Sequence, residues 1–355
     1  MRGPGVPILG WDVGGANIKV SRPEPDDGIS RAVLEHPFPL WREYRRLPSV
    51  LSALAGRAGR AQALAVDAGQ APAMAVTMTA ELADCFATKR EGVGFVVGAF
   101  RAAFPASATW FYGADGRFHS AEEAQERPLD VAAANWMASA TWVARTHPDA
   151  LFVDVGSTTT DIVPIVAGRV AAGGYTDLAR LRLGELVYTG CLRTPVSAIL
   201  RSVRLGAGRC RLAAEHFAVT ADVYRWLGRI TEEEYTCETP DGRGRSRSEA
   251  GARLARVVCA DLETLGAADI TAIADHIARA QTRQIRHGIR GVLRRLSTAR
   301  PHVAVLAGRG AFLARAAAEA ADLATCDLTG ELGGDAARAA PAAAVAQLLA
   351  EVLGR

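Results

Sequence analysis

Short apolar segments alternate along the chain with stretches in which apolar residues recur at helical spacing. Short apolar runs are typical of buried strands, and a period near 3.6 residues is typical of helices. Strands are expected as two pairs around a turn within 8–22 and within 150–170, and singly at 30–37, 73–79, 108–112 and 302–307. Helices are expected at 41–57, 88–104, 130–145, 275–296 and 340–353. This alternation predicts an α/β protein.

The beginning of the chain repeats itself one domain length later. Residues 12–19 read DVGGANIK and residues 154–161 read DVGSTTTD, at an offset of 154 − 12 = 142 residues. Each copy follows an apolar strand and leads into another. The repeat predicts two related halves, 1–147 and 148–355, around a central cleft. In the second half, a mostly helical insertion is expected at about 205–297.

Both copies place a glycine turn between two strands, where the backbone can approach a ligand closely. Successive N–H groups at such a turn bind phosphate oxygens, and hydroxyl side chains add donors. An ordinary hairpin turn would explain one copy alone, but two matched copies favour phosphate binding. The residues expected to bind phosphate at these turns are Gly14, Gly15, Asn17, Gly156, Ser157, Thr158 and Thr159.

An aspartate ends the first strand of each copy. Asp12 and Asp154 would repel a phosphate directly, so we expect them to hold a hydrated Mg²⁺ that meets the phosphates. Asp161 is expected as a further metal ligand, and Lys19 holds its place in the first copy. The two copies thus predict an anion-binding side and a metal-binding side.

Lysine is nearly absent from the chain. Of 41 basic residues only Lys19 and Lys89 are lysines, and the others are arginines. The two are therefore expected where a compact ammonium is needed and a planar guanidinium is not. Chance survival is the alternative.

A third glycine-rich element follows the apolar strand expected at 302–307. Gly308, Arg309 and Gly310 come directly before a helix, whose first N–H groups are free to bind phosphate.

Composition narrows the functional classes. The chain has 355 residues, 49% of them hydrophobic, and a net charge of +3, which suits two ordinary globular domains. Basic residues are not interleaved with aromatics, so nucleic-acid partners are not expected. No signal peptide is visible and no apolar run reaches the roughly 18 residues of a membrane span, which predicts a cytoplasmic protein without a membrane partner. Six cysteines stand singly, as small neutral thiols do, and form neither a zinc knuckle nor a disulfide framework.

The two turns and the later G-x-G, in this order, resemble the phosphate-1, phosphate-2 and adenosine motifs of the actin/sugar-kinase/Hsp70 superfamily, which implies duplicated RNase H-like α/β domains. A closer likeness lies in WDVGGANIK (11–19), VTMTAELADCFATKREGV (76–93), VDVGSTTTDIVPI (153–165), VYTGCLRTPV (187–196), FAVTADVYRWLG (217–228) and LAGRGAFLA (306–314). These motifs resemble the hydantoinase/oxoprolinase-related family of tetrahydromethanopterin-linked C1-transfer pathway proteins, over nearly the whole chain.

The resemblance implies a transferase of methanofuran biosynthesis. Archaeal relatives in this family join an aminomethylfuran diphosphate to the phenol of tyramine or γ-glutamyltyramine. The implied partner is a small phosphorylated substrate, the implied cofactor is Mg²⁺, and diphosphate leaves. The catalytic residues expected are Asp12, Lys19, Asp154, Glu81 and Lys89.

The middle motif (residues 77–92) is absent from generic kinases, so we expect it to carry the substrate chemistry. Glu81 or Asp84 would pair with the ammonium group of an aminomethylfuran, Lys89 would neutralise diphosphate, and Thr79 would contact the substrate. Carboxylates favoured by a helix N-terminus are the alternative explanation for the two acids.

Two further segments could border the substrate. Tyr188 and Thr189 are expected on the opposite wall, although an ordinary loop would explain them too. Residues 241–247, DGRGRSR, would form either a basic lid over phosphate or a solvated loop.

Two other classes of function stay open. The third glycine motif favours an ATP-dependent kinase or a hydantoinase/oxoprolinase-type ring hydrolase. Asn17, however, stands where nucleotide-hydrolysing relatives carry a hydroxyl, which fits a site where diphosphate is the leaving group. A non-catalytic nucleotide-binding scaffold is the second alternative. A phosphate-release assay with ATP separates these classes.

Overall fold

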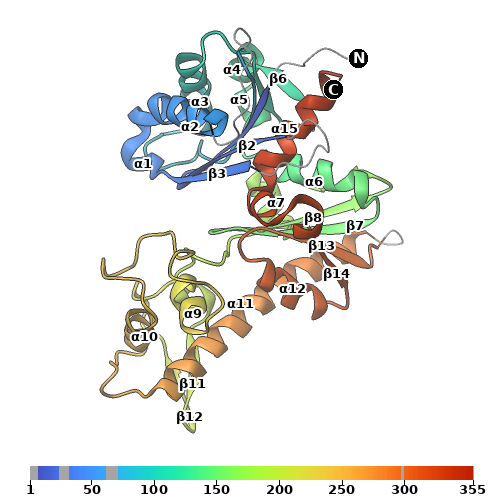
Figure 1. Ribbon diagram of the computed structural model, residues 1–355. Coiled ribbons are helices and arrows are strands. Elements are labelled where there is room, and N and C mark those ends of the chain that lie inside the picture. The colour runs from blue at the N-terminus through green and yellow to red at the C-terminus, as the bar shows by residue number, and fades with distance from the viewer. Residues whose placement is uncertain (1–6, 24–31, 61–70, 297–299, 355) are drawn as a thin grey trace. The chain divides into compact units, whose positions relative to one another are not determined.

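The computed structural model describes residues 7–23, 32–60, 71–296 and 300–354 (Figure 1). The chain divides into two compact units, each made of segments that are distant in sequence. Unit 1 comprises Met1–Phe152, Val163–Arg180 and Cys326–Arg355, and unit 2 comprises Val153–Ile162 and Leu181–Thr325. The halves expected at 1–147 and 148–355 stay a prediction.

The centre of unit 1 is a six-stranded sheet. Its strands are β1 (Ile8–Val13), β2 (Asn17–Arg22), β3 (Ala32–Pro37), β4 (Ala73–Met78), β5 (Thr109–Tyr112) and β6 (Phe118–Ser120). They lie in the order β3-β2-β1-β4-β5-β6, with β1 antiparallel to β2 and parallel to β4. Every residue of β1 and β4 is buried, as expected for central strands covered on both faces.

Helices from both ends of the chain cover this sheet (Figure 1). The alanine-rich α15 (Ala340–Val352) contacts β1, β2 and β4, and α2 (Leu47–Arg60) contacts β2, β3 and α3 (Lys89–Ala103). Trp11 of β1 meets the Phe100 ring of α3 edge-on, with ring centroids 5.6 Å apart. The other helices of unit 1 and its margins are α1 (Leu40–Glu43), η1 (Tyr44–Arg46), α4 (Ala121–Glu126), α5 (Pro128–Val131), α6 (Asn135–Thr146), α7 (Asp177–Leu183), α13 (Thr329–Leu332) and α14 (Gly334–Arg338).

A second sheet repeats the order of the first. Its strands are β7 (Ala150–Val155), β8 (Thr160–Val166), β9 (Arg169–Val170), β10 (Leu186–Val187), β13 (Val303–Ala307) and β14 (Ala324–Asp327). They lie in the order β10-β8-β7-β13-β14, and β9 pairs with β8. In both sheets the strand before the glycine turn lies between the strand after it and a later strand, as β2-β1-β4-β5 and β8-β7-β13-β14. This confirms the duplicated α/β fold that the sequence predicts.

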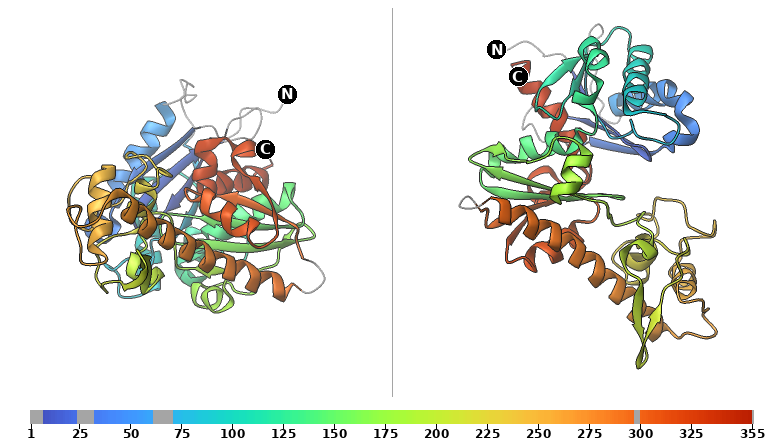
Figure 2. Two further views of the ribbon diagram at one scale, coloured as in Figure 1. Left: turned by 90° about the horizontal axis from the view of Figure 1, so that it is seen from below. Right: turned by 180° about the vertical axis from the view of Figure 1, so that it is seen from behind.

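The insertion of unit 2 is built on one long helix. Its elements are α8 (Val196–Ile199), β11 (Ser202–Leu205), β12 (Gly208–Arg211), α9 (Thr220–Trp226), α10 (Arg247–Arg256) and α11 (Ala267–Arg295), with α12 (Ala311–Glu319) following β13. The β11–β12 ribbon lies beside the first half of α11 (Figure 2), where the His276 ring accepts a hydrogen bond from the Arg204 N–H.

Three details of the expected elements are wrong. The helix expected at 130–145 is split, because Ala133 has a left-handed φ of 49° between α5 and α6. Helix α11 begins at Ala267 and not at 275, since the Asp269 carboxylate accepts the Gly266 N–H at 3.1 Å and caps the helix there. The insertion is less helical than expected, as it contains β11 and β12. Residues 30–31 of the third expected strand lie outside the described residues.

Among the described residues, no helix is both long enough and apolar enough to cross a membrane.

Candidate functional site

The first hairpin (residues 12–19) carries a charge pair whose acid is buried. Its turn is closed by a hydrogen bond from the Gly14 N–H to the Asn17 carbonyl at 3.0 Å, and Asp12 lies opposite Lys19 across the two strands. The Asp12 carboxylate is buried, and the Lys19 Nζ lies 3.7 Å from its Oδ2. A cation on the neighbouring strand therefore balances the acid within the hairpin itself. Gly15 of the same turn is half-buried.

The second hairpin (residues 154–161) has the same turn with different charges. The Gly156 N–H donates to the Thr159 carbonyl at 2.9 Å, which is the bond of the first hairpin 142 residues later. Equal turns give equal registers, so Asp154 lies opposite Asp161. Where the first hairpin has an acid and a base, the second has two carboxylates.

The residues of the second turn are partly accessible. Gly156, Ser157, Thr158 and Thr159 are all half-buried. Their amides and hydroxyls belong to one tight turn, which is the arrangement that binds phosphate oxygens. The turn therefore offers donors for phosphate directly beside two carboxylates suited to a divalent cation.

The G-x-G element lies against the second hairpin. Gly308 has a φ of +83°, and a Cβ there would lie 2.1 Å from Oδ1 of Asp154, so only glycine fits. The Gly310 N–H donates to the Val155 carbonyl at 2.8 Å. The half-buried Arg309 stands between the two glycines. The structure thus brings Gly308 and Gly310 together with Asp154 at the end of β7.

The middle motif occupies the matching place beside the first hairpin. The Thr79 N–H donates to the Val13 carbonyl at 2.9 Å, and Val13 is the counterpart of Val155 at the offset of 142. The Thr79 side chain is exposed, and its hydroxyl lies close to Gly14. Unit 1 therefore carries the middle motif where unit 2 carries its G-x-G.

A buried carboxylate and a lysine form the centre of the middle motif. Glu81 is 1% exposed, and the Nζ of Lys89 lies 3.6 Å from its Oε1. Burial raises the pKa of Glu81 to about 7, although the nearby Lys89 charge opposes the shift. Oε2 of Glu81 has no hydrogen-bond partner among the described residues. Asp84, the other acid of this motif expected to meet the substrate, is exposed.

Asp177, at the start of α7, completes this group and was not expected from the sequence. Its Oδ2 lies 2.5 Å from the Nζ of Lys89. Burial disfavours the charged ammonium, but Asp177 and Glu81 together hold the pKa of Lys89 above its usual value. No local signal joins residues 88 positions apart. The scarcity of lysine was the only hint that Lys89 has acidic neighbours.

The segment 187–196 packs against the backbone of the second hairpin. The Cys191 N–H donates to the Gly156 carbonyl and the Arg193 N–H to the Ser157 carbonyl, each at 2.9 Å. A Cβ on Gly190 would lie 2.5 Å from the backbone of Ser157 and Thr158. Glycine at this position therefore lets the segment reach the hairpin backbone.

Thr189 and Tyr188 have opposite environments. Thr189 is 1% exposed, its carbonyl accepts the Thr160 hydroxyl at 2.7 Å, and its own hydroxyl accepts from Gln281. Tyr188 is 68% exposed. The structure places Thr189 in the scaffold of the hairpin and leaves only Tyr188 open to a ligand.

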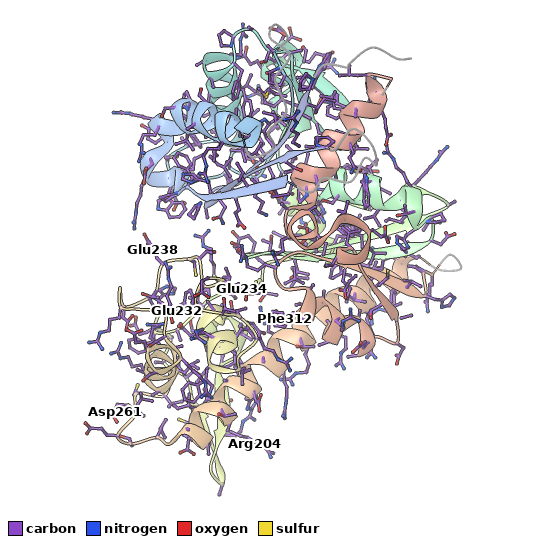
Figure 3. The ribbon with its side chains drawn as sticks, in the orientation of Figure 1. Arg204, Glu232, Glu234, Glu238, Asp261 and Phe312 are labelled. Carbon is purple, nitrogen blue, oxygen red and sulfur yellow. The ribbon has the colours of Figure 1, made fainter. Side chains whose placement is uncertain are left out.

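One hydrogen-bonded chain links this support to the insertion. Gln281 of α11 donates to the Gly190 carbonyl at 2.8 Å and accepts from the Tyr224 hydroxyl at 2.6 Å. The Tyr224 ring meets that of Phe312, labelled in Figure 3, with centroids 4.9 Å apart. Helices α9, α11 and α12 are thereby tied to the second hairpin.

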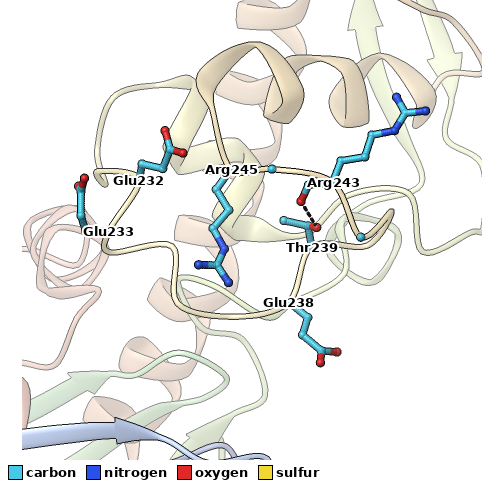
Figure 4. A pocket seen from close by; sticks show the side chains of 8 residues that line it. Glu232, Glu233, Glu238, Thr239, Arg243 and Arg245 are labelled. Carbon is cyan, nitrogen blue, oxygen red and sulfur yellow. Dashed lines mark hydrogen bonds between the residues drawn. The ribbon is translucent and has the colours of Figure 1, made fainter.

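The loop before α10 is held by its own charges. Asp241 receives hydrogen bonds from Arg253 and Arg256, each at 3.0 Å, and the Thr239 hydroxyl donates to the Arg243 carbonyl at 2.7 Å. Beside it lies a cavity of about 670 Å³ (Figure 4). Charges of both signs line this cavity, from Glu232, Glu233 and Glu238 and from Arg243 and Arg245. Because acidic side chains line this cavity as well, the surface beside the loop is not purely basic. The expected role of the loop as a lid over phosphate stays a prediction.

The two cysteines inside motifs do not form reactive thiolates. Burial raises the pKa of Cys191 to about 12, and it also raises the pKa of Cys85. Both thiols stay protonated at neutral pH, so nucleophilic catalysis by either is not supported.

Two sheets of the same strand order, each with a glycine hairpin, define the actin/sugar-kinase/Hsp70 class of α/β proteins. Solved structures agree with this fold. The ethanolamine utilization protein EutJ from Carboxydothermus hydrogenoformans matches with a TM-score of 0.50 at 12% identity, covering 97% of this chain and 90% of that chain. An acetone carboxylase matches with a TM-score of 0.54 at 10% identity, covering 96% of this chain and 70% of that chain.

Sequence comparison narrows the class to a family. The hydantoinase/oxoprolinase family model matches residues 73–352. The chain is 36% identical over 349 residues to the (4-{4-[2-(gamma-L-glutamylamino)ethyl]phenoxymethyl}furan-2-yl)methanamine synthase of Methanocaldococcus jannaschii, covering 98% of this chain and 99% of that protein. The synthase of the same name from Methanococcus vannielii is 43% identical over 117 residues, 33% of this chain and 52% of that protein. This chain belongs to the hydantoinase/oxoprolinase family.

Proposed function

We propose that this chain is a transferase that joins a furanylmethyl diphosphate to a phenol and releases diphosphate. The observation that carries the proposal is the 36% identity, over nearly the full length of both chains, to a synthase whose named product is a phenoxymethyl-furan. The proposed donor is an aminomethylfuran-methyl diphosphate, and the proposed acceptor is tyramine or glutamyltyramine.

The reaction balances without an oxidant, a reductant or ATP. The bond between the furanylmethyl carbon and the diphosphate oxygen breaks, and a bond between that carbon and the phenol oxygen forms. The phenol proton leaves, and diphosphate carries away the electron pair of the broken bond. Since electrons of the furan ring stabilise positive charge on the methyl carbon, stabilising the departing diphosphate is the main task of the protein.

The second hairpin would bind the departing diphosphate. Its turn amides and the hydroxyls of Ser157, Thr158 and Thr159 supply donors for phosphate oxygens. Asp154 and Asp161 are hard oxygen donors on adjacent strands and fit a Mg²⁺ ion with part of its water shell. A bound Mg²⁺ would neutralise charge on the diphosphate, and the two carboxylates would hold it.

In unit 1, carboxylates hold the two lysine ammonium groups. Lys89 is held by Asp177 at 2.5 Å and by Glu81 at 3.6 Å, which fixes its ammonium in one position. Lys19 is held by Asp12 in the first hairpin. Because Glu81 is buried and contacts Lys89, we assign it the role of positioning that lysine, in place of the expected contact with the substrate.

The proposal includes a cytoplasmic location. All six cysteines are free thiols, which is typical of a reducing compartment. The substrates are small molecules, and the proposal needs no nucleic-acid or membrane partner.

An ATP-dependent reaction is the second candidate. The hydantoinase/oxoprolinase match and the placement of Gly308–Gly310 against the second hairpin favour it, because a diphosphate site alone does not need a third glycine element.

One pair of assays separates the candidates. Purified protein with Mg²⁺, the furanylmethyl diphosphate and tyramine or glutamyltyramine is expected to yield the aryl ether, detected by mass spectrometry, and one diphosphate for each ether, without ATP. Phosphate release from ATP in the absence of furan, together with no ether, would instead establish the second candidate.

A further inference from the structure

Three side chains of types that can bind a metal ion meet in unit 1. They are His147, directly after α6, Cys326 of β14 and Glu331 of α13. One donor atom of each, an imidazole nitrogen, a thiol sulfur and a carboxylate oxygen, lies within 4.8 Å of the other two. All three residues are half-buried.

Their geometry is partly fixed before any ion binds. The Nε2 of His147 lies 2.5 Å from the Oε1 of Glu331. The Thr146 hydroxyl donates to the other carboxylate oxygen of Glu331 at 3.2 Å. A hydrogen-bonded partner that orients a ligating carboxylate is a common feature around protein metal sites.

The donor set selects the kind of metal. Magnesium and calcium prefer oxygen ligands only, whereas a thiolate, an imidazole and a carboxylate together suit Zn²⁺. Three protein ligands leave one position of a tetrahedral ion for water. An ion pair of histidine and glutamate at the surface would contribute little to stability, and it would not explain the thiol beside it.

We propose that His147, Cys326 and Glu331 bind one Zn²⁺ ion. Binding takes up neutral His147, the ionised carboxylate of Glu331 and the thiolate of Cys326, so the thiol proton is released to solvent. The ion would link two parts of unit 1. One is the end of α6, and the other is the segment that begins at Cys326 and runs into the last helices. This role is separate from the proposed transferase reaction and from its Mg²⁺.

Thiol alkylation of the full-length wild-type protein tests the site directly. After removal of metals with a chelator, the protein is treated with iodoacetamide with and without added Zn²⁺, and labelled peptides are quantified by mass spectrometry. We expect Zn²⁺ to slow the alkylation of Cys326 by at least about tenfold, since a bound thiolate must first be released. Cys259, which is exposed and lies in unit 2, is the internal control and should react at the same rate in both samples. Equal rates at Cys326 would overturn the proposal.

Metal binding and spectra give a second test. The wild-type protein should bind about one equivalent of Zn²⁺, and Co²⁺ should give a thiolate-to-metal charge-transfer band. Both should be lost in Cys326→Ser and weakened in Glu331→Gln, and both should persist in Cys259→Ser. A Co²⁺ band that survives in Cys326→Ser would place the ion elsewhere and reject this site. Should Cys326→Ser fail to fold, Glu331→Gln and the wild-type alkylation result still decide the question.

Discussion

The two glycine hairpins share a turn and differ in what stands across from their aspartates. In the first hairpin Asp12 faces Lys19, with 3.7 Å between the ammonium nitrogen and the carboxylate oxygen. In the second hairpin Asp154 faces Asp161. The first hairpin therefore places a lysine across from its aspartate, and the second places another aspartate there. The two copies share the closing hydrogen bond of the turn, although five of the eight residues in 12–19 differ from those in 154–161.

The segments that hydrogen-bond to the two hairpins also differ. The Val155 carbonyl accepts from Gly310 of the G-x-G element, whereas the equivalent Val13 carbonyl accepts from Thr79 of the middle motif. The middle motif continues into Glu81 and Lys89. The equivalent carbonyl thus binds the G-x-G element in unit 2 and the charged middle motif in unit 1.

The largest effect is expected at the two aspartates. Asp154→Asn and Asp12→Asn should each lower the rate of ether synthesis roughly 10²-fold or more, the scale of lost preorganised electrostatic contacts. Asp154→Asn should also raise the Mg²⁺ concentration needed for half-maximal rate, because it removes one of two facing carboxylates. Asp12→Asn should raise it less, because Lys19 already balances that acid. Rates measured across a Mg²⁺ titration check this, and equal shifts in both variants would contradict the difference between the hairpins.

The buried acid of the middle motif should make stability depend on pH. The pKa of Glu81 rises from 4.5 to about 7 on folding, so the folded state prefers the protonated form. Its favourable contribution is complete below pH 4.5 and is lost as the pH rises through 7. Relative to Glu81→Gln, the wild-type protein should lose about 3 kcal/mol of unfolding free energy between pH 4 and pH 8.

Denaturant unfolding of both proteins across this pH range measures the difference. Asp84→Asn, which changes an exposed carboxylate of the same motif, is the matched control. A difference between wild type and Glu81→Gln that stays constant with pH would show that Glu81 is not held in a desolvated environment.

A smaller effect is expected at Gly190, where the segment 187–196 lies closest to the second hairpin. Gly190→Ala would place a Cβ 2.5 Å from the backbone of Ser157 and Thr158, so we expect a loss of about 2 kcal/mol in the free energy of unfolding. Gly15→Ala, in the turn of the first hairpin, meets nothing within 4 Å and should cost less than about 1 kcal/mol. Denaturant unfolding of the two variants is the measurement, and similar losses would mean that the close approach at Gly190 is unimportant.

The smallest expected effect concerns the two lysines. Lys19→Arg and Lys89→Arg keep the charge but replace a compact ammonium with a planar fork. We expect turnover to fall about tenfold in each, equivalent to about 1.4 kcal/mol of transition-state stabilisation. Arg90→Lys, on the exposed side of α3, serves as the control for the general tolerance of such exchanges. Wild-type turnover in both lysine variants would mean that their survival in an arginine-rich chain is accidental.

Much of the fold could be predicted because its signals are local. The repeat of the Asp-Val-Gly turn at an offset of 142 residues predicted the duplication, and the identical hydrogen bonds at Gly14 and Gly156 bear it out. The start of α11 was placed eight residues too late, although Ile270 and Ile273 are already buried at helical spacing and Asp269 caps the helix. The break before α6 was missed because nothing in the sequence around Ala133 announces a left-handed residue.

The sequence by itself determined the strand–turn–strand hairpins and their glycines, because a backbone turn depends on a short segment of the chain. The rarity of lysine is a matter of composition and is also visible from the sequence alone. Only the tertiary structure decided which side chains meet. Asp177 reaches Lys89 across 88 residues, Thr189 turns inward to Gln281 while Tyr188 turns outward, and His147 meets Glu331 across 184 residues. Such pairings depend on how strands are ordered in a sheet and which helices cover it. That order is set by burial of the whole core, so no single segment of the chain contains it.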